Sequence, residues 1–148
     1  MAEVTVAELK HARLMGNKDF SGFDLSVLNL SGVGWLRGCT LERADLSGAN
    51  LEDANLSGAN LEGANLHEAN LSGAHLHEAN LSGAFLEDAN LRSAALLEAN
   101  LSGANLSGAN LEGAHLSGAN FEGAHLRRVL CDDLTRWPYE FDMERLRG

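Results

Sequence analysis

The sequence predicts an all-β fold, a parallel β-helix in which the chain winds into a narrow tube around a hydrophobic interior. Leucine recurs at every fifth position from Leu36 to Leu126, and Phe121 is the one substitution. Alanine occupies the position two residues before each of these centres, from Ala44 to Ala124. Most of the residue pairs that follow a centre are Ser-Gly, Glu-Gly or another polar pair, which suits a turn. These three observations describe a structural unit of five residues.

A period of five excludes the two standard elements. A helix repeats every 3.6 residues and a strand alternates every two, so successive leucines would face different sides of either element. Each pentad is therefore expected to end in a change of direction and to form one side of a polygon. We expect the coils to stack with like positions over one another, at a rise of about 4.8 Å per coil, the spacing of neighbouring strands.

The predicted core consists of the leucine and alanine positions, because residues two apart on an extended segment point to the same side. Alanine leaves room for leucine in a tube too narrow for two large side chains. The intervening Asn points outward and can hydrogen-bond either nearby backbone or the Asn one coil along. The predicted core comprises Leu36, Leu41, Leu46, Leu51, Leu56, Leu61, Leu66, Leu71, Leu76, Leu81, Leu86, Leu91, Leu96, Leu101, Leu106, Leu111, Leu116, Phe121 and Leu126, with Ala44, Ala49, Ala54 and the later alanines of that slot.

The repeat region is predicted over residues 20–131, with a one-residue bulge near residues 31–35. Three earlier centres, of which Phe20 is the first, are offset by one residue from the later register. Two glycines in the bulge suit unusual backbone angles, and either Trp35 or Leu36 is expected to fill the core there. Cys131 falls on the last position of the register, and Cys39 takes an alanine slot, so both cysteines are expected to point inward.

Both ends of the tube are expected to carry caps. Residues 1–19 form the predicted N-terminal cap, with a short helix over about residues 5–15 that begins at a capping box of Thr5 and Glu8. Residues 132–148 form the predicted C-terminal cap, with a short helix near residues 141–147. Trp137, Tyr139 and Phe141 either cover the last coil or contact a second copy, so the chain is expected to be a monomer or a homodimer through a terminal cap.

The pattern resembles the pentapeptide-repeat family, whose signature is A(N/D)LXX, over roughly residues 20–131. Twenty consecutive pentads in register, centred on positions 36 to 131, make this resemblance specific. The resemblance implies a right-handed quadrilateral β-helix, a β-solenoid with four pentads per coil. For this chain it implies about five to six coils.

The charge distribution argues against direct nucleic-acid binding. The formal net charge is −10, and residues 41–126 carry all of it, with Arg43 and Arg92 as their only basic residues besides histidine. A basic footprint is therefore lacking. No apolar run is long enough to cross a bilayer, and residues 1–14 lack the apolar stretch of a secretory signal. We expect a cytoplasmic protein, in keeping with two cysteines too far apart for a disulfide.

No pattern in the sequence indicates an enzyme, and we expect no catalytic site, no cofactor and no structural metal site. The serines lie in turn positions, and no Gly-rich loop has the spacing or Lys of a phosphate-binding loop. Five histidines fall in outward slots, and His75 and His77 flank Leu76 at a spacing that can bind a transition metal weakly. Four hydrophobic residues are candidates for a surface contact, namely Leu97, Phe85, Trp137 and Phe141.

Two functions fit these features. The first is a structural or interaction scaffold that presents a regular acidic surface to an unknown protein partner. The second is a DNA mimic that inhibits or protects a DNA-handling enzyme such as DNA gyrase, as the family resemblance allows. Residues 41–126 carry about 0.5 negative charges per Å of tube, against about 0.6 for duplex DNA. The acids are spread over all four predicted sides, however, and leucine rather than phenylalanine fills the centres, so the scaffold is the favoured hypothesis.

Overall fold

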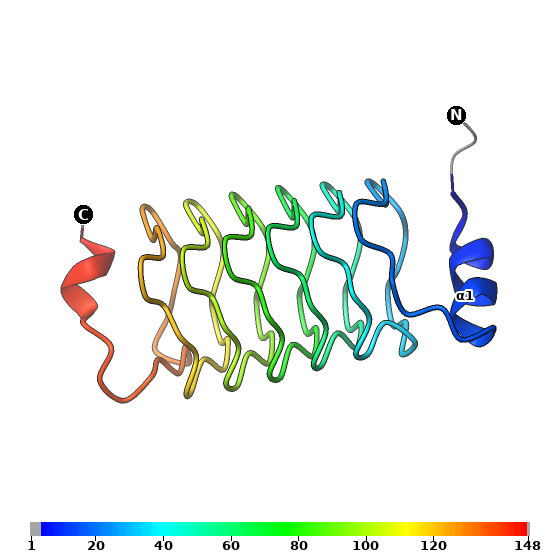
Figure 1. Cartoon of the computed structure of the whole chain (residues 1–148). Helices are drawn as coiled ribbons and strands as arrows, with labels where there is room; N and C mark the ends of the chain where they lie inside the picture. The colour runs from blue at the N-terminus through cyan, green and yellow to red at the C-terminus, as the bar shows by residue number, and fades with distance from the viewer. Residues whose placement is uncertain (1–3, 148) are drawn as a thin grey trace.

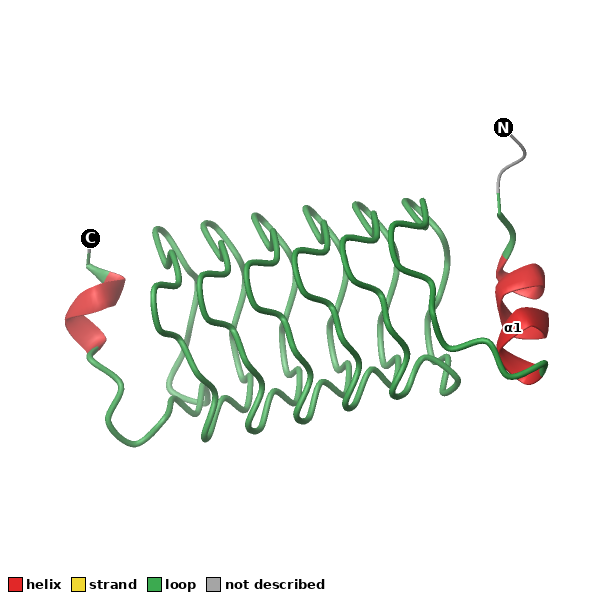
Figure 2. Ribbon diagram, viewed as in Figure 1, coloured by secondary structure: helices red, strands yellow, loops and turns green. Residues whose placement is uncertain are grey.

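The structure, a computed structural model, describes residues 4–147. The chain winds into stacked coils that form a tube, with a helix at each end (Figure 1). The first is α1, an α-helix over Val6–Leu14, and the second is η1, a 3-10 helix over Met143–Leu146. Between them the path is drawn as loop throughout (Figure 2). The tube is built from parallel β-bridges, as expected for an all-β fold, but each side of a coil contributes one isolated bridge residue rather than a strand.

The coil has four sides because most bridges join residues twenty positions apart, which is four pentads, and all of these bridges are parallel. We name the sides by their bridge residues. Side A carries Asp19, Thr40, Asn60, Asn80, Asn100 and Asn120; side B carries Asp24, Asp45, Asn65, Phe85, Asn105 and His125; side C carries Asn29, Asn50, Asn70, Asn90, Asn110 and Leu130; and side D carries Asn55, His75, Ala95, His115 and Arg136. Strands stay this short because two of every five residues form the turn at the corner.

The interior of the tube is filled by the leucines and alanines of the repeat. Every repeat leucine from Leu36 to Leu116 and every repeat alanine from Ala44 to Ala114 is at most 1% exposed. Phe121 and Leu126 are also buried, near the C-terminal end. Burial of a leucine side chain contributes roughly 1.5–3 kcal/mol, so the repeated leucines supply the main force that closes the tube.

The outward asparagines tie the corners and the coils together. Asn70 accepts a hydrogen bond through Oδ1 from the main-chain N–H of Ser72, at 3.1 Å, which holds the turn that follows. Its Nδ2 donates to Oδ1 of Asn50 one coil back, at 3.2 Å. Similar bonds run along sides A and C. The asparagines therefore hydrogen-bond both to nearby backbone and to the Asn one coil along.

The bulge near residues 31–35 is present in the bridge pattern. Asp19 pairs with Thr40 at a spacing of twenty-one, whereas Thr40 pairs with Asn60 at twenty. Leu36 is the residue that fills the core, and Trp35 is only half-buried. The carbonyl of Trp35 accepts a hydrogen bond from Arg13 Nε at 3.0 Å, so the bulge also anchors the end of α1.

The prediction for Cys131 was wrong, because its side chain is exposed. His115 pairs with Arg136 at a spacing of twenty-one, so a second one-residue insertion ends the regular register after Leu130. Thr135 precedes the bridge residue Arg136 as Ala114 precedes His115, so it takes the alanine slot of this last side, at 9% exposure, and its hydroxyl donates to the carbonyl of Leu111 at 2.9 Å.

Packed caps close both ends of the tube. Thr5 and Glu8 form the capping box of α1, and Leu9 is buried against the first coil. At the other end Trp137 stacks on Phe141 with ring centroids 4.3 Å apart, and both rings contact Phe121. Neither helix among residues 4–147 is long and apolar enough to cross a membrane.

Candidate functional site

A shallow recess on side B is the first candidate site. It has a volume of about 430 Å³ and is lined by Asn65, His67, Phe85 and Glu87. Phe85 occupies a bridge position where an Asn is usual, and its ring is 51% exposed. His67 lies one coil before Glu87 at the same corner, and its Nε2 is 3.5 Å from a carboxylate oxygen of Glu68.

The carboxylate of Glu87 gives this recess its chemistry. One oxygen, Oε1, accepts a hydrogen bond from the side-chain amide of Asn105 in the next coil. The other oxygen, Oε2, is buried and has no hydrogen-bond partner among residues 4–147. A buried carboxylate oxygen without a partner costs free energy, so a donor that reached it would be favoured. A cationic group is suited to this place, because it can hydrogen-bond to the carboxylate oxygen and stack on the face of the neighbouring aromatic ring.

Side D has a different character around Leu97. This side chain is 38% exposed at a corner position that is otherwise polar. Ala95 precedes it at the bridge position, and His75 lies one coil back. The two hydrophobic candidates of the repeat, Phe85 and Leu97, therefore lie on different sides and do not form one patch.

Trp137 and Phe141 are half-buried and engaged with Phe121, so they form the cap rather than a free surface. Other hydrophobic side chains are exposed at this end of the tube. Tyr139 is fully exposed, and Leu134 and Met143 are more than half exposed. The sequence pattern did not single out Leu134 or Met143, because the repeat that fixes direction has ended there.

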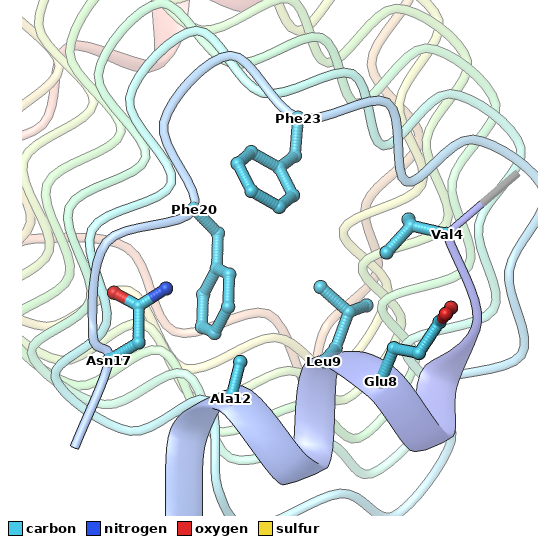
Figure 3. A pocket seen from close by; sticks show the side chains of 7 residues that line it. All are labelled: Val4, Glu8, Leu9, Ala12, Asn17, Phe20 and Phe23. Atoms are coloured by element: carbon cyan, nitrogen blue, oxygen red, sulfur yellow. The ribbon is translucent and has the colours of Figure 1, made fainter. Parts of the chain in front are cut away.

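A second recess lies between α1 and the first coil, as Figure 3 shows. It has a volume of about 340 Å³, and the rings of Phe20 and Phe23 face the side chains of Leu9 and Ala12 across it. Glu8 lies at its edge with the carboxylate bound to Thr5, and this hydroxyl hydrogen bond holds the pKa of Glu8 below its usual value. The sequence placed Phe23 in an alanine slot, but its position at the open end leaves the ring partly exposed.

The comparisons with known proteins agree with the repeat. A family model described as pentapeptide repeats matches in eight copies, over residues 36–73, 69–108 and 96–130. The chain belongs to the pentapeptide-repeat family. No curated protein matches the chain.

Solved structures of other pentapeptide-repeat proteins are similar to this chain. Rfr23 from the cyanobacterium Cyanothece 51142 is 36% identical, with 89% of this chain and 99% of that chain covered and a TM-score of 0.42. The protein alr5209 from Nostoc Pcc 7120 is 33% identical, with coverage of 98% and 95% and a TM-score of 0.36. HetL from Nostoc sp. strain PCC 7120, involved in heterocyst differentiation regulation, is 25% identical, with coverage of 86% and 94% and a TM-score of 0.29.

Proposed function

We propose that this pentapeptide-repeat protein is a non-catalytic scaffold that binds a protein partner through the recess on side B. The unpartnered Oε2 of Glu87 beside the exposed ring of Phe85 is the observation that carries the proposal. An Arg or Lys side chain of the partner would pair with the Glu87 carboxylate once a rotation of this side chain turns Oε2 outward, and it would pack its charge over the ring. The acidic corners of the tube support the same choice, because they attract a basic partner before contact.

Side B supports this role better than side D. Glu68 and Asp88 are exposed at the same corners as the recess, so the carboxylate of Glu87 belongs to a locally negative strip. The corner of Leu97 offers an apolar side chain, but among residues 4–147 it has no buried side-chain acceptor that lacks a partner. A single exposed apolar residue is common on protein surfaces and does not by itself indicate a contact.

Quantitative affinity purification from the source cells tests the proposal. Wild-type chain, Phe85→Ser with Glu87→Gln, and the matched control Leu97→Ser would each serve as bait. We expect partners that wild type and the Leu97 variant capture equally and that the side B variant loses. Equal capture by all three baits would exclude side B as the interface.

The DNA mimic is the second candidate, and the charge density of residues 41–126 is the observation that favours it. Its weakness is the division of the acids among corners on all four sides. Glu62 and Glu122 follow side A, Glu112 follows side C, and Glu78 and Glu98 follow side D. A gyrase supercoiling assay separates the two hypotheses, because inhibition or protection at micromolar protein is expected only for the mimic.

For assembly and location we propose a cytoplasmic monomer. The engagement of Trp137 and Phe141 with Phe121 supports a monomer, since these half-buried rings already pack against their own chain. The exposed free thiol of Cys131 suits a reducing compartment. Light scattering with size-exclusion chromatography tests the monomeric state, and the mass of a dimer would contradict it. Cell fractionation tests the cytoplasmic location.

A further inference from the structure

His75 and His77 form a pair of imidazoles on side D. They flank the buried Leu76 on one side of the tube, so both side chains point outward from the same short segment. Their ring centroids lie 6.1 Å apart, and the ring planes are inclined by 34°. None of the other described histidines has a second histidine two positions away.

Neither ring is engaged with another side chain. At many bridge positions an Asn accepts a hydrogen bond from the main-chain N–H two residues on, as Asn55 does from Ser57 at 3.0 Å. His75 replaces that Asn, and within residues 4–147 neither His75 nor His77 makes a side-chain hydrogen bond or an ion pair. The nitrogens of both imidazoles are therefore available to an external ligand. His67 differs, because its Nε2 lies near the carboxylate of Glu68.

The spacing of the rings fits a shared metal ion. Two imidazoles that bind one metal through nitrogens at about 2.0–2.1 Å place their ring centroids about 4.5 Å apart when the angle at the metal is about 90°, and about 6.4 Å apart when it is about 180°. The observed 6.1 Å falls within this span, so the separation of the rings suits a shared ion, and rotation about the side-chain bonds would aim one nitrogen of each ring at it. We propose that His75 and His77 bind one transition-metal ion on side D.

The surroundings define what kind of site this is. The next bridge residue on this side is Ala95, whose small side chain leaves space beside His75. His115 lies two coils from His75, about 10 Å away at strand spacing, which is too far to share the ion. No group of three or more potential ligands is present in residues 4–147. Two protein ligands and water therefore complete the coordination, and the ion exchanges readily.

Ligand chemistry sets the class of metal. Neutral imidazole suits copper, zinc and nickel, and affinity for a given nitrogen site is highest for Cu²⁺. Two nitrogens on one rigid segment bind more tightly than two separate histidines, because the second contact is intramolecular. The open positions on the ion remain accessible to a donor from another molecule.

Titration of the tag-free chain with Cu²⁺ alone tests the site. Calorimetry measures the affinity, and electron paramagnetic resonance reports the nitrogen donors on the ion. The variants are His75→Gln and His77→Gln, and the matched control is His115→Gln, a lone histidine on the same side. We expect one Cu²⁺ per wild-type chain, bound reversibly through two nitrogen donors and more tightly than by a single histidine. Each pair variant is expected to lose at least about tenfold in affinity and one nitrogen donor, whereas the control keeps both.

Two results would overturn the site. Wild-type affinity in both pair variants would show that the pair is not the ligand. An equal loss in the His115 variant would show adventitious binding to any surface histidine. Circular dichroism checks that each variant retains the fold, and none of these residues lines the side B recess, so the result is independent of the proposed partner.

Discussion

Arg145 donates from Nη2 to the main-chain carbonyl of Ala124, at 3.0 Å. In earlier coils the corresponding carbonyl accepts from a main-chain N–H of the next coil, as that of Ala104 does from His125 at 2.9 Å. No further coil follows Ala124, so the guanidinium takes the place of the missing backbone donor. The same nitrogen also donates to the carbonyl of Phe121, at 3.0 Å. The cap thus closes the hydrogen-bonding edge as well as the hydrophobic end.

Arg145→Met is expected to lower the stability of the C-terminal end. The substitution keeps an apolar side chain of similar length, but it removes the guanidinium from over the Phe141 ring and leaves the carbonyl of Ala124 without its donor, at a cost of about 1–3 kcal/mol. Urea unfolding measures the global effect, and hydrogen exchange measures opening of the last coil. Arg147→Met is the control, because within residues 4–147 the Arg147 side chain pairs with Glu144 alone, at the exposed surface. A similar change in both variants would contradict the capping role.

Asn80→Ala is expected to destabilise the tube more than Asn55→Ala. Asn80 donates to Asn60 at 3.0 Å, accepts from the amide of Asn100 at 3.3 Å, and holds the turn at Ser82. Asn55 makes only the turn bond to Ser57 among residues 4–147. The lost bonds between coils correspond to a difference of about 1–2 kcal/mol in the free energy of unfolding.

Thermal and urea unfolding of the two Asn variants, measured side by side, checks this difference. The pair is well matched, since both positions are bridge residues of the repeat and both asparagines are half-buried. Equal destabilisation would mean that only the turn bond contributes to stability and that the Asn–Asn hydrogen bonds between coils contribute nothing.

The sequence predicted the features that follow from the five-residue period, but it did not predict those that depend on single side-chain contacts. Leucine at every fifth position has no alternative to an inward direction, so the burial of residues such as Leu76 follows from spacing alone. The insertion after Leu130 could not be placed, because it depends on Thr135 reaching the carbonyl of Leu111 across the coil. The same holds for the recess on side B. Phe85 stands out in the sequence, but the unpartnered oxygen of Glu87 depends on where Asn105 lies.

Val27→Gly is expected to stabilise the protein. Val27 has a φ of 52° and is 80% exposed, so a β-branched residue adopts a left-handed conformation with little burial in return. That conformation costs about 1–2 kcal/mol for a residue with a Cβ, and the greater freedom of glycine in the unfolded chain offsets about half. A rise of about 0.5–1 kcal/mol in the free energy of unfolding should follow.

Gly48→Val provides the opposite change one coil along. Gly48 has a φ of 62°, and a Cβ there would lie 3.3 Å from a methyl group of Val27, so this variant is expected to lose stability. Urea unfolding of both variants checks the pair. Loss of stability in Val27→Gly would mean that contacts of the valine methyl groups outweigh the backbone strain.

Cys131 is expected to react with a thiol reagent in the folded protein, whereas Cys39 reacts only after unfolding. The first thiol is exposed and the second is buried, with its S–H donating to the carbonyl of Trp35 at 3.4 Å. Burial raises the pKa of the Cys131 thiol, and the Asp132 carboxylate raises it further, so less thiolate is present at neutral pH than for a free cysteine. The reaction should therefore be slow near neutrality and accelerate as the pH rises.

Labelling with the thiol reagent, followed by measurement of the intact mass, should give one modified site in native protein and two in denaturant. Cys131→Ser should abolish the native reaction. Two sites labelled at equal rates in the native protein would instead place Cys39 at the surface and contradict the burial of its thiol.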